Sequence, residues 1–304
     1  MSSLIEVSGK QVRIRGRVLR MAQLEADMYQ FIDDDPEPIL EALRKSPTRI
    51  DVFSFLQKVP ATTPKYSYPM EWDNFAALNL TTYDQWWNEQ IGFKARNKAK
   101  QALKKGVIVR EVPFDDTLVK GIQEVYNETP IRQGAPNKHY GKNFETVYRE
   151  EATFLDLSVF IGAFLGDSLI GFIKMVHDDS KTQAGLMNIV SMVRHRDLAP
   201  TNALVVQAVK SCTDRGIPHL VYSRFSYTKK QRSSLADFKE RNAFQQVNVP
   251  RYFVPLTSAG ALAVRMGLHK NLTDHVPEPV LNKLRELRTA WYKRKFQSAT
   301  TEGS

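Results

Sequence analysis

The stretch from Ser158 to Leu256 constrains the fold of this chain most, because its turn signals and hydrophobic patterns predict six elements in a fixed order. Two apolar runs, 160–164 and 169–175, flank a Gly-Asp turn and predict a β-hairpin. The next five elements are expected to be a buried strand over 185–193, a helix over 200–216, a strand over 217–223, and a short helix and a final strand within 234–256. Such an order is typical of a mixed α/β fold with a central sheet flanked by helices.

The rest of the chain also has readable patterns. Alternating residues around Gly9 predict strand structure over 4–20. Asp35 and Pro36 are expected to open a helix with an inward face of Ile39, Leu40 and Leu43. Further strands and helices are predicted over 49–56, 75–80, 82–106, 107–112, 115–126 and 143–155. The polar loop over 129–142 is too long for a simple connection, so it either overhangs a site or is a surface excursion.

Composition excludes several classes of protein. The chain has 304 residues, 42% of them hydrophobic, which suffices for one large or two modest globular domains. A single cysteine, Cys212, leaves no intramolecular disulfide and favours a reducing compartment, and its helical spacing predicts a core position rather than a nucleophile. No run is apolar for the ~18 residues of a membrane helix, and the first residues lack the apolar core of a signal peptide. We therefore expect a cytoplasmic protein.

The net charge of +10 favours anionic partners, although a thinly spread excess is the alternative. The helical pattern around 94–105 carries six cations and no acid, as either a solvated face or a contact for phosphate or RNA. After a short helix over 258–266, a basic amphipathic helix is predicted over 278–296. It would pack on the domain, or contact a membrane surface or nucleic acid. Residues 297–304 form an expected disordered tail.

Three motifs in this order resemble the GNAT acyl-CoA N-acyltransferase superfamily. They are the Gly166-Asp167 hairpin turn, the Asp-Arg-Gly-Ile run over 214–217, and the segment Phe238-Lys239-Glu240-Arg241-Asn242-Ala243-Phe244. In the last motif Ala243 stands at the glycine position of a Gly-Phe pair that precedes the final strand. The resemblance implies a GNAT-like fold, and it covers roughly residues 81–256.

Within the superfamily the chain is most similar to the FemAB-related branch. The basic run over 96–107, directly before the first core strand, resembles the opening of that branch. The resemblance implies a domain organisation in which residues 1–80 are either a small mixed unit of their own or a reduced second GNAT-like half of a degenerate tandem pair. Residues 81–256 would be the acyltransferase domain, residues 257–296 a helical extension and residues 297–304 the tail.

The resemblance also implies a place for the donor, between the strands over 185–193 and 217–223. The pyrophosphate of coenzyme A would rest on the helix that begins near Pro200, where free N–H groups and the helix dipole favour anions. The loop before this helix has no glycine, which departs from the family pattern. The residues expected to bind the cofactor are Val193, Arg194, Arg196, Thr201 and Asn202. In the alternative, Thr201 only caps the helix and the arginines are solvated.

Two donors are compatible with a loop that lacks glycine. The first is acyl-CoA, which side chains would hold. The second is aminoacyl-tRNA, which some members of the FemAB-related branch use and whose phosphates would suit the basic helix. The usual leaving-group tyrosine of the family is absent, because the helix before the last strand offers Phe238 and Lys239. The candidates for catalysis are Tyr222, Tyr227 and His195. The alternative is that Tyr222 only packs in the core and that Tyr227 and His195 are merely exposed. The candidates for acceptor binding are Arg132, His139 and Tyr140.

Other chemistries find no matching motif. The six histidines lack metal-ligand spacing, so no metal cofactor is expected, and phosphate-loop, dinucleotide and nucleophile-elbow motifs are absent. The sequence therefore predicts an N-acyltransferase or aminoacyltransferase that acts on an amine-bearing small molecule, peptide or saccharide, with tRNA as a possible partner. The alternative is a non-catalytic GNAT-derived binding module with a basic surface for nucleic acid or other anionic partners.

Overall fold

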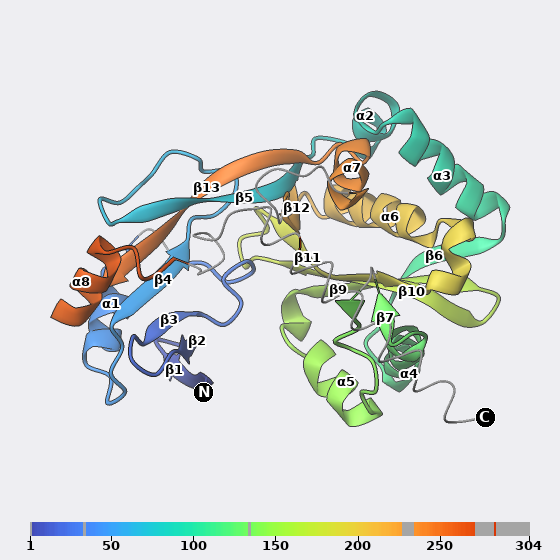
Figure 1. Ribbon diagram of the computed structural model, residues 1–304. Coiled ribbons are helices and arrows are strands. Elements are labelled where there is room, and N and C mark those ends of the chain that lie inside the picture. Colours follow the sequence, from blue (N-terminus) through green and yellow to red (C-terminus); the bar gives the residue numbers. More distant parts are fainter. Residues whose placement is uncertain (1, 33–34, 133–134, 227–233, 271–282, 284–304) are drawn as a thin grey trace. The chain divides into compact units, whose positions relative to one another are not determined.

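The computed structural model describes residues 2–32, 35–132, 135–226, 234–270 and 283 (Figure 1). The chain divides into two compact units, and neither of them is a continuous segment. The first unit holds the described residues within Met1–Thr82, His177–Gly185 and Cys212–Asn271, and the second those within Tyr83–Val176 and Leu186–Ser211. The predicted domains are continuous segments, 1–80, 81–256 and 257–296, so their boundaries differ from those of the two units. This domain organisation stays a prediction.

The first unit is built on a mixed β-sheet with the strand order β1-β2-β3-β4-β13-β5-β12-β11. Its strands are β1 (Ser2–Val7), β2 (Lys10–Arg15), β3 (Met21–Leu24), β4 (Val52–Leu56), β5 (Met70–Asn79), β12 (His219–Arg224), β13 (Gln245–Pro255) and the first residues of β11 (Ala184–Ser191). The β3–β4 and β11–β12 pairs are parallel and the other pairs antiparallel. Strand β13 lies between β4 and β5, so a late segment completes the middle of this sheet.

The core of the first unit gathers apolar residues of β2, β3, β4 and β13 against α1 (Glu37–Arg44). The predicted inward face of α1 is confirmed, because Ile39, Leu40 and Leu43 are buried. The carboxylate of Asp35 accepts the N–H of Glu37 at 3.0 Å at the start of this helix. Helix α8 (Ser258–Arg265) follows β13, and the hydroxyl of Thr257 caps it by accepting the N–H of Gly260 at 3.0 Å.

The sheet of the second unit has the order β11-β10-β9-β6, from β10 (Ser168–His177), β9 (Ser158–Leu165) and β6 (Val107–Val112). The predicted hairpin is confirmed, because Leu165 faces Ser168 and leaves Gly166 and Asp167 as a two-residue turn. Strand β6 pairs antiparallel with β9. Apolar residues fill β9 and β10 on both faces, as expected of strands covered by helices on both sides.

Helices α4 (Asp116–Asn127) and α5 (Phe144–Glu151) cover one face of this sheet (Figure 1). Helix α3 (Phe93–Lys104) and the start of α6 (Pro200–Asp214) lie on the other face. Helix α4 begins at Asp115, whose carboxylate accepts the N–H of Leu118 at 2.8 Å. Helix α5 begins at Asn143 in the same way. Apolar side chains of α4 and α5 pack against β9 and β10 in one core. The connection between the two helices contains a short hairpin of β7 (Ile131–Arg132) and β8 (Ala135–Pro136).

The single helix predicted over 82–106 is wrong in one respect. The structure divides it into α2 (Tyr83–Gln85), a π-helical turn (Trp86–Gln90) and α3 (Phe93–Lys104). The break lies at Ile91 and Gly92, both of which have extended backbone. Trp86 is fully buried, so burial of this large side chain overrides the helical pattern. Gly106 ends the helical region with a positive φ of 83°, as predicted.

The turn that follows α7 (Ser234–Arg241) explains one motif of the sequence. Ala243 has a left-handed backbone with φ of 68°, the conformation that favours glycine. The N–H of Phe244 donates to the carbonyl of Lys239 at 3.0 Å, and the N–H of Ala243 donates to that of Glu240 at 2.9 Å. These two bonds form a Schellman cap, so Ala243 occupies a position that glycine fits better.

The mixed α/β fold with helices on its sheets is therefore confirmed. The predicted helix over 278–296, apart from residue 283, lies outside the described residues, as do the tail over 297–304 and Tyr227. Among the helices that are described, none has both the length and the apolar character to span a bilayer.

Candidate functional site

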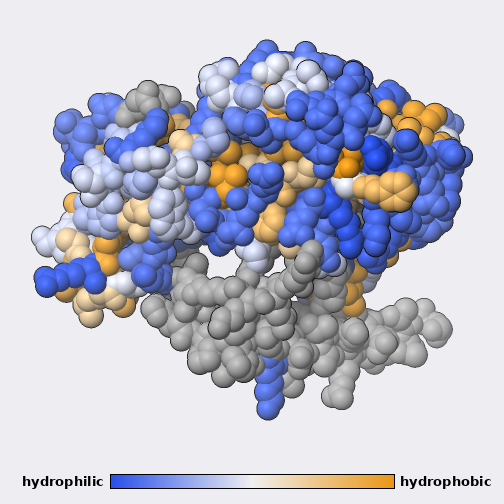
Figure 2. Space-filling model, turned by 90° about the horizontal axis from the view of Figure 1, so that it is seen from above, coloured by the Kyte–Doolittle hydropathy of each residue, from blue (hydrophilic) through white to orange (hydrophobic). Residues whose placement is uncertain are grey.

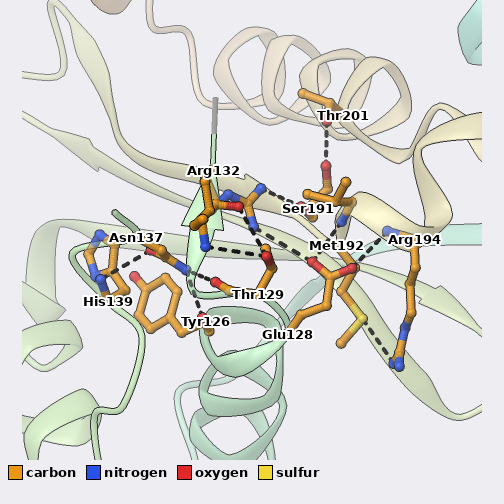
Figure 3. A network of polar contacts seen from close by, with 12 residues as sticks. Tyr126, Glu128, Thr129, Arg132, Asn137, His139, Ser191, Met192, Arg194 and Thr201 are labelled. Atoms are coloured by element: carbon orange, nitrogen blue, oxygen red, sulfur yellow. Dashed lines mark hydrogen bonds and ion pairs between the residues drawn. The ribbon is translucent and has the colours of Figure 1, made fainter. Parts of the chain in front are cut away.

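The end of β11 and the start of α6 form a corner in the second unit. The chain leaves β11 at Ser191, makes a short 3-10 helix over Val193–Leu198, and enters α6 at Pro200. Ala199 links the two helices with a left-handed backbone of φ 54°. Proline at the first position suits the start of α6, because its missing N–H would have no helical partner there. This corner contains the residues predicted to bind the cofactor, and Figure 3 labels two of them, Arg194 and Thr201.

A carboxylate from another helix occupies this corner. Glu128, at the end of α4, accepts the N–H of Val193 with Oε2 and the N–H of Arg194 with Oε1, both at 2.7 Å. Its side chain is only 8% exposed. Two backbone N–H groups that converge on one anion are a usual way of binding carboxylate or phosphate. Here the anion belongs to the chain itself.

Sequence analysis missed Glu128, although one signal points to it. An acid at the C-terminal end of a helix opposes the helix dipole, so it needs donors from elsewhere. Arg132 supplies a positive charge, with Nη1 4.0 Å from Oε2 of Glu128. Its Nη2 donates to the carbonyl of Ser191 at 2.5 Å. The pKa of Arg132 is lowered from its ordinary value, because the effect of burial exceeds that of Glu128. An arginine guanidinium nevertheless stays charged at physiological pH. Arg132 thus fixes the β7–β8 hairpin to the end of β11.

The remainder of the loop over 129–142 is held by its own side chains. Asn137 donates through Nδ2 to the carbonyls of Tyr126 at 2.8 Å and Thr129 at 3.0 Å. The ring of His139 stacks on that of Tyr126, with centroids 4.1 Å apart. Burial and then Lys142 lower the pKa of His139 to about 4, so the imidazole is neutral at physiological pH. The described residues Asn137 and His139 of this loop are therefore tied to α4.

Tyr140, by contrast, is 49% exposed at the tip of the same loop. Its backbone N–H donates to the carbonyl of Asn137 at 3.0 Å. The structure thus brings Arg132 and His139 into one network, while the Tyr140 side chain extends toward solvent. All three remain candidates for acceptor binding.

A buried polar cluster next to the corner links α4, α5, β10 and β11. The hydroxyl of Tyr126 donates to Glu151 at 2.7 Å, and the amide of Asn188 donates to both oxygens of the same carboxylate at 2.9 and 3.0 Å. Lys174, fully buried on β10, donates to the carbonyls of Glu151 and Thr153, both at 2.6 Å. Burial lowers the pKa of Lys174 to about 8. These bonds satisfy the end of α5 and link it to β10 and β11.

The other predicted cofactor residues have different environments. Thr201 shares a hydrogen bond of 2.7 Å with the hydroxyl of Ser191, so it ties the start of α6 to β11. Asn202 donates its backbone N–H to Ala199 at 3.1 Å. Arg194 and Arg196 have exposed side chains, and Nη2 of Arg194 lies 3.2 Å from the sulfur of Met192. His195 is half-buried beside them. The arginines are thus available to solvent, while the N–H groups of Val193 and Arg194 are occupied.

The first unit holds a second group of candidate residues, around Tyr222 on β12. The ring of Tyr222 meets Phe244 edge-on at 5.8 Å, and Nζ of Lys239 lies 4.7 Å from the ring centre. Lys239, on α7, is fully buried and its Nζ hydrogen-bonds the carbonyl of Arg224. Burial lowers the pKa of Lys239 to about 8. Sequence analysis noted this lysine only as the replacement for a tyrosine, since burial of a lysine cannot be read from its helix.

Strands β11 and β12 form a short parallel ladder in the first unit. It consists of two pairs, Ala184 with Leu220 and Gly185 with Val221. Gly185 is required there, because a Cβ atom would lie 2.4 Å from the ring of Tyr29. Cys212, in α6, is fully buried, and burial raises the pKa of its thiol to about 12. The expected core role of Cys212 is confirmed.

Comparisons with known proteins identify the fold. No protein-family model and no curated protein matches this chain. Solved structures do match: the C-terminal domain of a putative lysylphosphatidylglycerol synthetase from Agrobacterium fabrum has 13% identity and a TM-score of 0.56, with 87% of each chain covered. The structure of L-PGS from Bacillus licheniformis has 13% identity and a TM-score of 0.56, covering 87% of this chain and 88% of that one. FemX has 11% identity and a TM-score of 0.54, covering 82% and 87%. The chain therefore has a GNAT-like, FemAB-related fold, as its motifs predict.

Proposed function

We propose that the protein transfers an acyl or aminoacyl group from an ester or thioester donor to an amine-bearing acceptor. The observation that carries this proposal is Lys239, a fully buried ammonium group on the helix before the last strand of the fold. Its pKa of about 8 lies near the pH at which such a reaction would run. A general acid is most effective when its pKa is close to the working pH.

The proposed chemistry needs one proton donor for the leaving group. The neutral amine attacks the carbonyl carbon, a C–N bond forms, and the C–O or C–S bond of the donor breaks. Lys239 gives its proton to the leaving oxygen or sulfur once the bound donor has displaced the carbonyl of Arg224 from the buried Nζ. The proton of the attacking nitrogen passes to water. Tyr222, whose ring lies against the ammonium group, is a positioning residue in this scheme. Tyr227 and His195 remain alternative proton donors.

The second unit supports a donor without a diphosphate at the corner. Glu128 already occupies the N–H groups of Val193 and Arg194, which the resemblance assigns to coenzyme A. An aminoacyl-tRNA, used by some members of the FemAB-related branch, would not need these groups. Acyl-CoA held by Arg194, Arg196, Thr201 and Asn202 is the alternative donor. The single buried Cys212 fits a reducing compartment, so the proposed location is the cytoplasm.

The acceptor in this proposal is the amine of a small molecule, peptide or saccharide. The residues proposed to bind it are Arg132, which has a charged guanidinium, His139, which has a neutral imidazole, and Tyr140, which has an exposed phenol. The name of one structural neighbour, lysylphosphatidylglycerol synthetase, describes an aminoacyl product in that protein. This name adds support for aminoacyl transfer as the reaction class.

The test compares donors and one pair of variants. Purified protein is incubated with acetyl-CoA, a long-chain acyl-CoA or a charged tRNA, together with a panel of amines, and product is followed by mass spectrometry. We expect Lys239→Met to lower the rate at least roughly a hundredfold and to abolish a pH-dependent limb near 8. Glu240→Ala, an exposed change on the same helix, is the control. A Lys239→Met variant that stays folded and keeps the full rate would contradict this role.

One observation favours a second candidate function, a non-catalytic binding module. The internal carboxylate at Val193 and Arg194 closes the donor site that the fold implies. A protein that had lost its reaction would have no use for that site. Absence of product with every donor, together with binding of an anionic ligand, would favour the module.

A further inference from the structure

The positive charge of this chain is concentrated in one short region. Residues 90–110 contain no acid and seven cations, while the whole chain has a net charge of +10. The cations are Lys94, Arg96, Lys98, Lys100, Lys104, Lys105 and Arg110. Most of the excess charge therefore lies on α3 and the start of β6. A field of one sign over such an area attracts extended anionic surfaces.

Helix α3 presents nearly all of these charges to solvent. Its buried face consists of three alanines, Ala95, Ala99 and Ala102. The side chains of the other positions therefore lie on the flanks and the outer surface, and five lysines there are exposed: Lys94, Lys98, Lys100, Lys104 and Lys105. An isolated helix of such composition would be unstable, so the alanine face fixes it to the unit.

Large apolar side chains are exposed among the lysines. Phe93 is 69% exposed at the start of α3, and Leu103 is 60% exposed near its end. Hydrophobic side chains also lie among hydrophilic ones on the face of the molecule seen in Figure 2. We call the five exposed lysines together with Phe93 and Leu103 the α3 patch. Its exposed apolar groups distinguish it from a purely solvated basic face.

Few groups of the described part of the chain neutralise the α3 patch. Lys105 lies 3.7 Å from the carboxylate of Asp197, and that carboxylate is exposed. Lys100 lies 5.8 Å from the ring centre of Trp87, which leaves its charge in place. Arg96 is not part of the patch, because its guanidinium donates to the carbonyls of Trp87 at 3.1 Å and Asn88 at 3.3 Å. The lysines are thus free to act on an external anion.

We propose that the α3 patch binds the protein to the surface of an anionic lipid bilayer. Lysines attract the negative headgroups, and Phe93 and Leu103 enter the boundary between headgroups and acyl chains. An RNA would use the same charges, yet it offers phosphates rather than an apolar layer to Leu103. The combination of cations and exposed apolar side chains therefore favours lipid. This inference does not depend on the proposed function.

The test measures binding of the full chain to vesicles by co-sedimentation. Vesicles of phosphatidylcholine with phosphatidylglycerol are compared with pure phosphatidylcholine, at low and at high salt. We expect binding to the anionic vesicles only, with loss at high salt. The triple variant Lys94→Gln, Lys98→Gln and Lys100→Gln should bind about a hundredfold more weakly, since each lysine near the surface contributes about fivefold. The double variant Phe93→Ser and Leu103→Ser should bind at least about tenfold more weakly.

A matched control separates the patch from total charge. Lys45→Gln, Lys120→Gln and Lys181→Gln remove three exposed lysines elsewhere and lower the net charge equally. This variant should bind as the unchanged protein does. Equal weakening by both triple variants would overturn the proposal, as would absence of binding to anionic vesicles. Binding of RNA through the same three lysines, with unchanged affinity in the Phe93→Ser and Leu103→Ser variant, would also overturn it. Far-ultraviolet circular dichroism confirms that each variant is folded.

Discussion

The Oε1 atom of Glu128 lies 2.7 Å from the backbone nitrogen of Arg194, 66 residues further along the chain. This bond joins the end of α4 to the corner between β11 and α6, and a second bond to Val193 makes the contact bidentate. The carboxylate thereby occupies two backbone N–H groups of a kind that also binds the oxygens of a phosphate.

Replacing this carboxylate should both destabilise the corner and open it. We expect Glu128→Ala to lower the free energy of unfolding by about 1–3 kcal/mol, because two backbone N–H groups lose their acceptor. Coenzyme A should then raise the melting temperature of Glu128→Ala more than that of the unchanged protein. Glu124→Ala, an exposed change on the same helix, serves as the control in both measurements. Equal shifts with coenzyme A in all three proteins would show that Glu128 only caps the turn.

Lys174 should be important for stability rather than for activity. Its ammonium group satisfies the carbonyls of Glu151 and Thr153 and the hydroxyl of Thr153. We expect Lys174→Met to lower the free energy of unfolding in urea by about 2–3 kcal/mol, since these acceptors would be buried without a donor. An unchanged midpoint and slope would mean that water reaches the end of α5.

The left-handed backbone of Ala243 predicts a stabilising substitution. Ala243→Gly removes the clash of Cβ with the backbone in this conformation, and we expect a gain of about 1 kcal/mol in the free energy of unfolding. Ala236→Gly, in the interior of the same helix, should instead cost about 1 kcal/mol. A loss of stability in Ala243→Gly would show that the alanine methyl group makes a packing contact worth more than the strain.

The neutral imidazole of His139 predicts a pH dependence of stability. Its pKa is about 4 in the folded protein and near the ordinary 6.5 in the unfolded chain, so the unfolded chain binds more protons between these values. The contribution of His139 is therefore fully present above pH 6.5 and falls as the pH drops toward 4, by up to about 3 kcal/mol. Urea unfolding of the unchanged protein and of His139→Gln at both ends of this range measures the difference. Parallel pH dependences would show that protonation of His139 is not linked to folding.

Local patterns predicted much of the fold correctly. The Gly166-Asp167 turn fixes the register of its hairpin, and the cap at Ala243 has the geometry that its place in the motif implies. Helix α6 begins at Pro200 as expected, because the fixed φ of proline suits a first helical turn. These features depend on residues close together in the sequence, where backbone geometry and hydrophobic periodicity act directly.

The arrangement of the candidate site residues depends on contacts that no local pattern contains. Arg194 was expected at the corner, but its N–H partner Glu128 comes from a helix that the sequence treats as ordinary. Lys239 was noted, while its burial against Tyr222 depends on the packing of β12 and β13. The break at Ile91 and Gly92 followed from the burial of Trp86. Long-range burial therefore decided the chemistry of this site, and periodicity alone could not.

The position of β13 in the first unit has a consequence for how the protein is made. Arg251 of β13 forms ion pairs with Asp27 and Asp73, and it lies 224 residues after the first of them. During synthesis, β4 and β5 leave the ribosome long before the strand that separates them exists. The edges that β13 covers must stay unpaired, or be shielded by a chaperone, until β13 has been synthesised. A nascent chain stalled before Gln245 should therefore be more sensitive to protease and to aggregation than the finished protein.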